Sequence, residues 1–122
     1  MLQNESLVRI VDNTGAKLGK VIRIIKGSRA RFAYLGDKVV LAVKEATPGG
    51  QISKGDVVRG VIVRTKKEVG RNDGTYIRFE DNAAAIIDKQ GNPKGKRIFG
   101  PVGKELRDKG FKALANLAEE VI

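Results

Sequence analysis

The sequence predicts a mainly β fold: a small closed β-barrel from which a basic β-ribbon projects, with two short α-helices at the C-terminal end. Three observations support this prediction. Short β-branched runs alternate with Gly-containing turns along most of the chain, which is typical of small barrels. The stretch Gly60–Ile87 has an apolar run at each end and a basic segment between them. The C-terminal segment carries apolar residues at helical spacing.

The chain length limits the number of domains. Its 122 residues are enough for one domain with a hydrophobic core and too few for two. We therefore expect a single domain, 1–122, with the barrel at about 1–100, the ribbon at about 64–78 and a helical region at about 101–122.

The first four strands are predicted from β-branched runs that follow turns. Leu7–Val11 and Lys17–Lys26 lie on either side of a turn at Asp12–Gly15. Lys17–Lys26 also fits a helical period, but its β-branched residues and flanking glycines favour a strand. Two similar segments, Gly36–Val43 and Gly55–Val63, each begin with a Gly-Asp turn and continue as a strand.

The aromatic residues Phe32 and Tyr34 follow a small loop, Gly27–Arg31. Aromatic side chains next to a basic loop can stack on bases. Core packing is the more common role for such residues, and we expect it here.

The central stretch predicts a long hairpin. Val61–Val63 and Ala83–Ile87 can both be buried, and the turn Asn72-Asp73-Gly74 lies between them. Burying several unpaired cations would be very unfavourable, so the middle of the hairpin must stay outside the core. Its basic residues are Lys66, Lys67, Arg71 and Arg78.

The C-terminal region predicts two helices. The first spans about Lys104 to Lys109 and ends at Gly110, and the second continues from Phe111 to Glu120. Four apolar residues of the second helix fall on one face and can cover one end of the barrel: Phe111, Leu114, Leu117 and Ala118.

The charge of the chain indicates a polyanionic partner. The net charge is +10 and the sequence pI is about 10.1, which favours nucleic acid. Basic residues recur without an intervening acid from Lys17 to Arg31. An anionic membrane is a weaker interpretation, because no stretch joins a basic face to large apolar anchors. The N-terminal segment resembles neither a signal nor a transit peptide, and we expect a cytoplasmic protein.

The composition argues against most enzyme classes. With no Cys and no His, the chain has no thiolate nucleophile, no imidazole base and no zinc cluster. Glu80 and Asp81 are neighbours on a predicted strand and point to opposite faces, so they do not form a catalytic pair. Lys94–Arg97 lacks the context of a phosphate-binding loop. We expect no enzymatic activity, no metal and no cofactor.

Several motifs in chain order closely resemble the bacterial-type large-subunit ribosomal protein fourteen family, over nearly the whole length. They are Val11–Ala16, Ala46–Gly50, Lys54–Val58, Gly60–Lys67, Asp73-Gly74, Tyr76–Phe79, Asn82, Ile86, Arg97–Val102, Glu105–Arg107 and Glu120–Ile122. The resemblance implies a five-stranded barrel with a projecting ribbon and two short C-terminal helices. It also implies a structural component of the large ribosomal subunit that binds large-subunit rRNA and contacts a neighbouring large-subunit protein.

The resemblance and the charge pattern together give candidate sites. The expected rRNA-binding residues are Lys17, Lys26, Arg29, Arg31, Lys44, Lys66, Lys67, Arg71, Arg78, Lys94, Arg97 and Arg107. The implied intersubunit bridge to small-subunit rRNA consists of Ala46, Thr47, Pro48, Gly49 and Gly50. The implied surface for a ribosome-silencing factor includes Lys96, Arg97, Lys112 and Asn116.

Two other interpretations are open at this point. A free-standing barrel that binds single-stranded nucleic acid would need an aromatic stacking platform, and this chain is poor in aromatic residues. A module that binds only proteins is disfavoured by the net charge of +10.

We expect the protein to belong to a ribosome of the cytoplasm rather than to one of an organelle.

Overall fold

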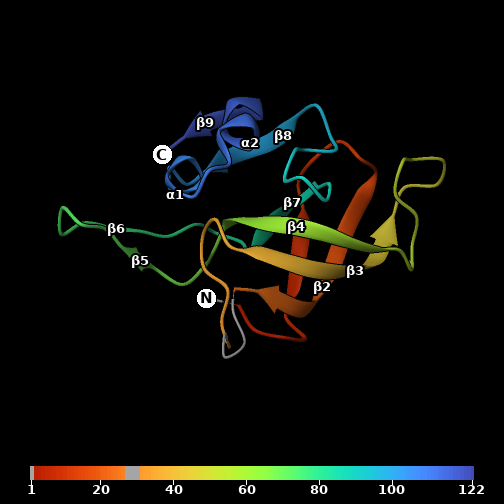
Figure 1. Ribbon diagram of the computed structural model, residues 1–122, viewed down its shortest axis with the longest axis horizontal. Coiled ribbons are helices and arrows are strands. Elements are labelled where there is room, and N and C mark those ends of the chain that lie inside the picture. Colours follow the sequence, from red (N-terminus) through yellow and green to blue (C-terminus); the bar gives the residue numbers. More distant parts are fainter. Residues whose placement is uncertain (1, 27–30) are drawn as a thin grey trace.

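The computed structural model describes residues 2–26 and 31–122 and has a closed β-barrel at its centre (Figure 1). The hydrogen-bonded order around the barrel is β1-β2-β3-β4-β7. These strands span Leu7–Ile10 (β1), Ala16–Ile25 (β2), Lys38–Ala46 (β3), Val57–Arg64 (β4) and Ala83–Ile87 (β7). The prediction of a mainly β fold with a five-stranded barrel is confirmed, and so is the assignment of 17–26 as a strand rather than a helix.

Closure depends on one parallel pair. β1 runs parallel to β7, with Arg9 opposite Ala83, whereas the other neighbouring strands of the barrel are antiparallel. The register of β2 shifts near Leu18 and again between Val21 and Arg23. Such bulges bend a long strand and help a small sheet to close. Closure leaves no free edge on these five strands.

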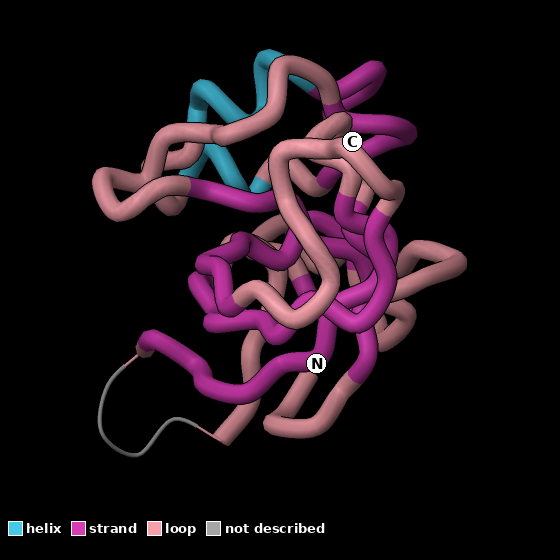
Figure 2. Tube along the Cα trace, turned by 90° about the vertical axis from the view of Figure 1, so that its right-hand side faces the viewer, coloured by secondary structure: helices cyan, strands magenta, loops and turns pink. Residues whose placement is uncertain are grey.

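From Gly60 onward β4 is buried on both faces, and so is the whole of β7. Their side chains alternate between the barrel interior, where Ile62 and Ala84 pack with Leu41, and the outside, where Val61 and Ala85 join a second cluster. The second cluster is completed by the C-terminal region, which lies against one side of the barrel (Figures 1 and 2). Burial on both faces explains why these strands have continuous apolar sequences instead of an alternating pattern.

The C-terminal region contains two helices and a small parallel sheet. The helices α1 (Glu105–Asp108) and α2 (Lys112–Leu117) are separated by Gly110, whose φ of 93° suits a glycine, and strand β8 (Ile98–Val102) pairs with β9 (Ala118–Val121). The predicted extension of the second helix to Glu120 is wrong. The chain becomes extended at Ala118, because Ala118 pairs with Ile98. The predicted covering of the barrel by Phe111 and Leu114 is confirmed.

The ribbon projects from the barrel beside the C-terminal region (Figure 1). Its strands β5 (Val69–Gly70) and β6 (Tyr76–Ile77) are antiparallel, and Gly74 at the predicted turn has a φ of 85°. Asp73 accepts hydrogen bonds from the backbone N–H and the hydroxyl of Thr75, at 3.0 and 2.6 Å. The predicted hairpin is therefore present.

The expectation that Phe32 and Tyr34 pack in the core is wrong. Their exposed fractions are 36% and 38%, whereas Ala33 and Leu35 between and after them are buried. In an extended segment, alternate side chains point to opposite sides, so only one of the two pairs could be buried. The pair with the smaller side chains, Ala33 and Leu35, faces the core. The ammonium of Lys26 lies 4.4 Å from the centre of the Tyr34 ring.

Candidate nucleic-acid interface

Most of the predicted RNA-binding cations are exposed. Eight of them make no ion pair with any described residue, and their side chains are exposed to solvent. They are Lys17, Arg31, Lys44, Lys66, Lys67, Arg78, Lys94 and Arg107. Arg29 lies outside the described residues. An exposed cation without an internal partner can neutralise a phosphate without first breaking an ion pair, and this is the property a phosphate contact needs.

Three of these cations lie together at the base of the ribbon. Phe79 N donates a hydrogen bond to Thr65 O at 2.9 Å, and further out Val69 pairs with Ile77. Lys66 and Lys67 on one arm and Arg78 on the other fall between these two cross-links. The backbone of Lys66 is held by the Asn82 side chain at 2.9 Å, and the carbonyl of Lys67 accepts from the Thr65 hydroxyl at 2.9 Å. These bonds fix the backbone of Lys66 and Lys67.

Three other predicted cations have partners within the protein. Lys26 Nζ is 3.0 Å from a carboxylate oxygen of Asp37. Arg97 is 3.7 Å from Glu119, and its guanidinium lies 5.2 Å from the centre of the Phe99 ring. The third, Arg71, is bound to Glu105 by two hydrogen bonds. Each of these cations would have to share or exchange a partner in order to bind phosphate.

Asp37 joins three segments of the chain. Its carboxylate accepts hydrogen bonds from Lys109 Nζ and from Tyr34 N, both at 2.8 Å, and also pairs with Lys26. Burial alone would raise the pKa of Asp37. The hydrogen bonds from Lys109, the backbone of Tyr34 and Lys26 outweigh burial, and the net pKa lies below its ordinary value.

Sequence reasoning missed the role of Arg64. This residue is buried, with an exposed fraction of 7%, at the end of β4. Its guanidinium donates two hydrogen bonds to Asp81, at 2.9 and 3.2 Å, and two more to the carbonyls of Phe99 and Pro101. Gly100, between those carbonyls, has a φ of 84°, and a Cβ there would collide with the guanidinium. The sequence signal for this role was an Arg directly after the apolar run Val61–Val63.

The predicted bridge loop follows β3 and lies at the opposite end of the molecule from the ribbon (Figure 1). Thr47, Pro48, Gly49 and Gly50 are exposed, while Ala46 is half-buried at the end of the strand. Thr47 N donates to Gly15 O at 2.7 Å, and a Cβ on Gly50 would lie 3.1 Å from the Cα of Gly15. The small size of Gly50 therefore serves contact with the neighbouring turn. At Gly49 no other atom would lie within 4 Å of an added Cβ, so only its φ of 83° requires glycine.

This loop, the turn 12–17 and Phe99 together line a surface hollow of about 600 Å³. The turn is held by Asp12, whose carboxylate accepts from Thr14 Oγ1 at 2.6 Å and from Ile86 N at 2.7 Å. Asp12 was predicted as a turn residue, and the structure shows that it also ties the turn to β7.

The residues of the predicted silencing-factor surface are exposed, and the fold brings them near one another. Lys112 and Asn116 are one turn apart on α2. Because Ile98 pairs with Ala118, Arg97 lies beside the end of that helix. Lys96 N donates to the Asn13 side chain at 2.8 Å, which fixes the chain just before β8.

Within residues 2–26 and 31–122, no three acidic, Cys or His side chains gather as they would around a metal ion. None of the described helices has the length and hydropathy of a membrane span.

Comparison with known protein families gives one match that covers the whole molecule. The model of the family described as ribosomal protein L14p/L23e matches residues 1–122. This match agrees with the barrel, the ribbon and the two short helices described above. The chain therefore belongs to the ribosomal protein L14p/L23e family and has a structural role in the large ribosomal subunit.

Proposed function

We propose that this protein binds large-subunit rRNA directly, through cations on the barrel and at the base of the ribbon. Family membership implies association with rRNA and ribosomal proteins. The observation that carries the proposal is the group Lys66, Lys67 and Arg78, which is exposed and makes no ion pair within the described residues. Binding releases counterions from the RNA, and this supplies a large, salt-dependent part of the affinity.

Recognition would depend on RNA shape more than on sequence. Helical RNA hides its base edges in a narrow groove, so proteins read its backbone and folded form. The ribbon and the β3–β4 loop project from opposite ends of the barrel, and this geometry suits contacts to RNA segments that are far apart (Figure 1). Lys17, Arg31, Lys44, Lys94 and Arg107 would add contacts on the body of the protein.

Two finer roles belong to the same proposal. The loop Ala46–Gly50 would contact small-subunit rRNA as part of an intersubunit bridge, supported by its exposure and its rigid attachment to Gly15. The surface around Lys96, Arg97, Lys112 and Asn116 would receive a ribosome-silencing factor. We also propose that the protein contacts a neighbouring large-subunit protein and that it belongs to the cytoplasmic ribosome.

The central test is RNA binding as a function of salt. We expect the triple variant Lys66→Ala, Lys67→Ala, Arg78→Ala to bind large-subunit rRNA more weakly. The slope of log K against log salt should decrease by about 2 to 3, since each lost phosphate contact removes roughly 0.7 to 0.9. The matched control Lys54→Ala, Arg59→Ala, Lys89→Ala removes the same charge elsewhere and should leave most of the slope. Equal slopes for the two triple variants would refute the assignment of the ribbon base.

The structure also gives a reason to test single-stranded nucleic acid. Phe32, Tyr34, Tyr76 and Phe99 are more than one-third exposed, and exposed rings can stack on bases. A competition experiment with folded rRNA fragments and single strands of equal length decides between the two functions. Preference for the folded fragment supports the ribosomal contact, and preference for the single strand supports the alternative.

A further inference from the structure

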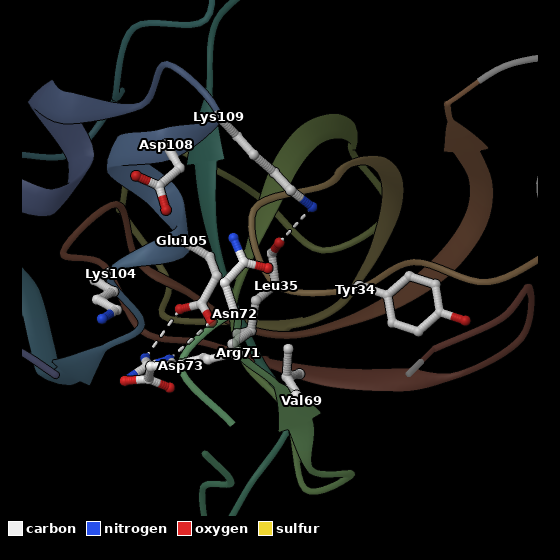
Figure 3. A pocket seen from close by; sticks show the side chains of 11 residues that line it. Tyr34, Leu35, Val69, Arg71, Asn72, Asp73, Lys104, Glu105, Asp108 and Lys109 are labelled. Carbon is white, nitrogen blue, oxygen red and sulfur yellow. Dashed lines mark hydrogen bonds and ion pairs between the residues drawn. The ribbon is translucent and has the colours of Figure 1, made fainter. Parts of the chain in front are cut away.

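Arg71 lies on the ribbon, yet its guanidinium points back to the body of the protein. Nε donates to one carboxylate oxygen of Glu105 at 3.2 Å and Nη2 to the other at 3.0 Å. Nη2 also donates to the carbonyl oxygen of Ile122 at 2.6 Å. The exposed fractions of the Arg71 and Glu105 side chains are only 14% and 17%. Figure 3 shows this pair in a cavity of about 430 Å³ between the ribbon and α1.

The partner of Arg71 is held rigidly. Glu105 begins α1, and the next residue, Leu106, is completely buried in the cluster that covers the barrel. At the end of α1, Lys109 Nζ donates to Leu35 O and to Asp37, both at 2.8 Å. The backbone at Glu105 is therefore a fixed point on the body of the molecule.

The rest of the ribbon has little attachment to that body. Between residues 68 and 77, the hydrogen bonds found among described residues stay within the ribbon, except for those of Arg71. β5 and β6 are joined by two residue pairs only. Asp73 at the tip adds a weak attraction to Lys104, which contributes to the lowered pKa of Asp73. A two-stranded hairpin on its own is only marginally stable in water, so contacts to the body matter for this ribbon.

We propose that Arg71 is a positioning residue, which fixes the orientation of the ribbon before RNA binds. A bidentate bond to a carboxylate has a defined geometry, and together with the bond to Ile122 it occupies the Nε and Nη2 donors of Arg71. Arg71 thus acts through the ribbon, by holding Arg78 and the arms beyond Lys67 in one arrangement relative to the fixed backbone of Lys66 and Lys67. The RNA part of this inference rests on the proposed function, whereas the effect on ribbon orientation does not.

The expected size of the effect follows from population shift. If loss of the pair leaves only about 10 to 30% of molecules with the ribbon in the binding orientation, the apparent Kd rises about 3- to 10-fold. The number of phosphates contacted in the bound state stays the same. The slope of log K against log salt therefore stays unchanged, in contrast to the loss of a direct contact.

Ribbon orientation can be measured in the isolated protein, because the chain has no Cys and accepts two unique spin labels. Suitable sites are Tyr76→Cys on the ribbon and Val57→Cys on the barrel, which are 73% and 64% exposed. In this background, Arg71→Gln should broaden the distance distribution between the labels. The matched control Arg78→Gln removes the same charge from the same ribbon and should leave the distribution narrow. The charge exchange Arg71→Glu with Glu105→Arg should restore much of the narrow distribution.

RNA binding supplies the second readout. We expect Arg71→Gln to weaken binding about 3- to 10-fold with an unchanged salt slope, whereas Arg78→Gln lowers the slope by about 0.7 to 0.9. A narrow distance distribution in Arg71→Gln would overturn the positioning role. A reduced slope in that variant would instead identify Arg71 as a direct phosphate contact. Salt-independent RNA binding by the unmodified protein would refute the proposed function. The width of the distance distribution between the spin labels would then decide the positioning role by itself.

Discussion

The barrel and the ribbon are both built from hydrogen-bonded strands but obtain their geometry from different forces. Each barrel strand pairs with two neighbours, and its inward side chains are almost completely buried. The ribbon strands pair only with each other, and of their four residues only Ile77 is buried. Apolar burial therefore determines the shape of the barrel. The ribbon depends on a turn, one ion pair and a few hydrogen bonds.

The comparison shows how one small protein combines a body held by apolar packing with an arm held by polar contacts. Apolar packing is insensitive to salt and to pH near neutrality, whereas ion pairs weaken in salt and with protonation. Changes in the interior of the barrel should destabilise the whole molecule. Changes in the ribbon should alter RNA binding while leaving the global stability almost unchanged. The predictions below test this division, beginning with the largest effect.

The largest loss of stability is expected from a cavity inside the barrel. Ile62 is completely buried and packs in the interior cluster. Ile62→Ala should lower the free energy of unfolding by about 2 to 5 kcal/mol, measured by urea denaturation. The control Val57→Ala, at a position that is 64% exposed on the same strand, should change it by less than about 0.5 kcal/mol. Similar losses in both variants would contradict the assigned core.

Arg64 should have the next largest effect. Arg64→Met keeps the apolar stem but leaves the carbonyls of Phe99 and Pro101 without this donor, and leaves Asp81 with Arg9 as its remaining ion-pair partner. We expect a loss of about 2 to 3 kcal/mol, because buried polar groups would lose their hydrogen bonds. Arg59→Met, an exposed change on the same strand, is the control. An unchanged unfolding midpoint for Arg64→Met would show that β8 does not need this link.

Acid should weaken the contact between α1 and the barrel through Asp37. Its folded-state pKa is below the unfolded value, so ionisation of Asp37 favours the folded state above the unfolded pKa. This stabilisation is lost as the pH falls through the folded pKa. Asp37→Asn removes the titrating group. Between pH 6 and pH 3, the free energy of unfolding of this variant should fall less than that of the unmodified protein, as measured by urea titrations at each pH. Parallel pH profiles for the two proteins would contradict this role.

The smallest effect is expected at the tip of the ribbon. Thr75→Val removes the hydroxyl that donates to Asp73 at 2.6 Å, which is the largest cause of the lowered pKa of that carboxyl. The pKa of Asp73 should rise toward its ordinary value, as followed by NMR titration of its side chain. Global unfolding should change by less than about 0.5 kcal/mol, because the site is exposed. A large global change would contradict the independence of the ribbon.

The strands and the ribbon could be predicted because their signals are local. β2 and β3 were predicted from β-branched runs that follow glycine-containing turns, and the turn at Asn72-Asp73-Gly74 has residues that favour a hairpin. β9 was missed because Ala118–Val121 has little strand preference of its own and becomes a strand only by pairing with β8. Phe32 and Tyr34 were placed in the core wrongly, because the sequence does not show which side of an extended segment faces inward.

The candidate site was predicted only in part for a related reason. Composition identified the cations, and the net charge of +10 indicated an anionic partner. Composition did not distinguish Lys66 from Arg71. Lys66 is exposed and makes no ion pair within the described residues, whereas Arg71 binds Glu105. Composition also missed Arg64, whose partners are up to 37 positions away in the chain.

The sequence by itself determined the fold class, the basic character and the lack of Cys and His chemistry, because β-branched runs, turn preference and residue content are properties of neighbouring residues or of the whole composition. Only the tertiary structure decided which strand faces are covered and which cations are paired. Ion pairs and packing depend on distances between segments remote in the chain. Since these interactions weaken steeply with distance, only the folded arrangement distinguishes the cation that meets solvent from the one that holds the ribbon in place.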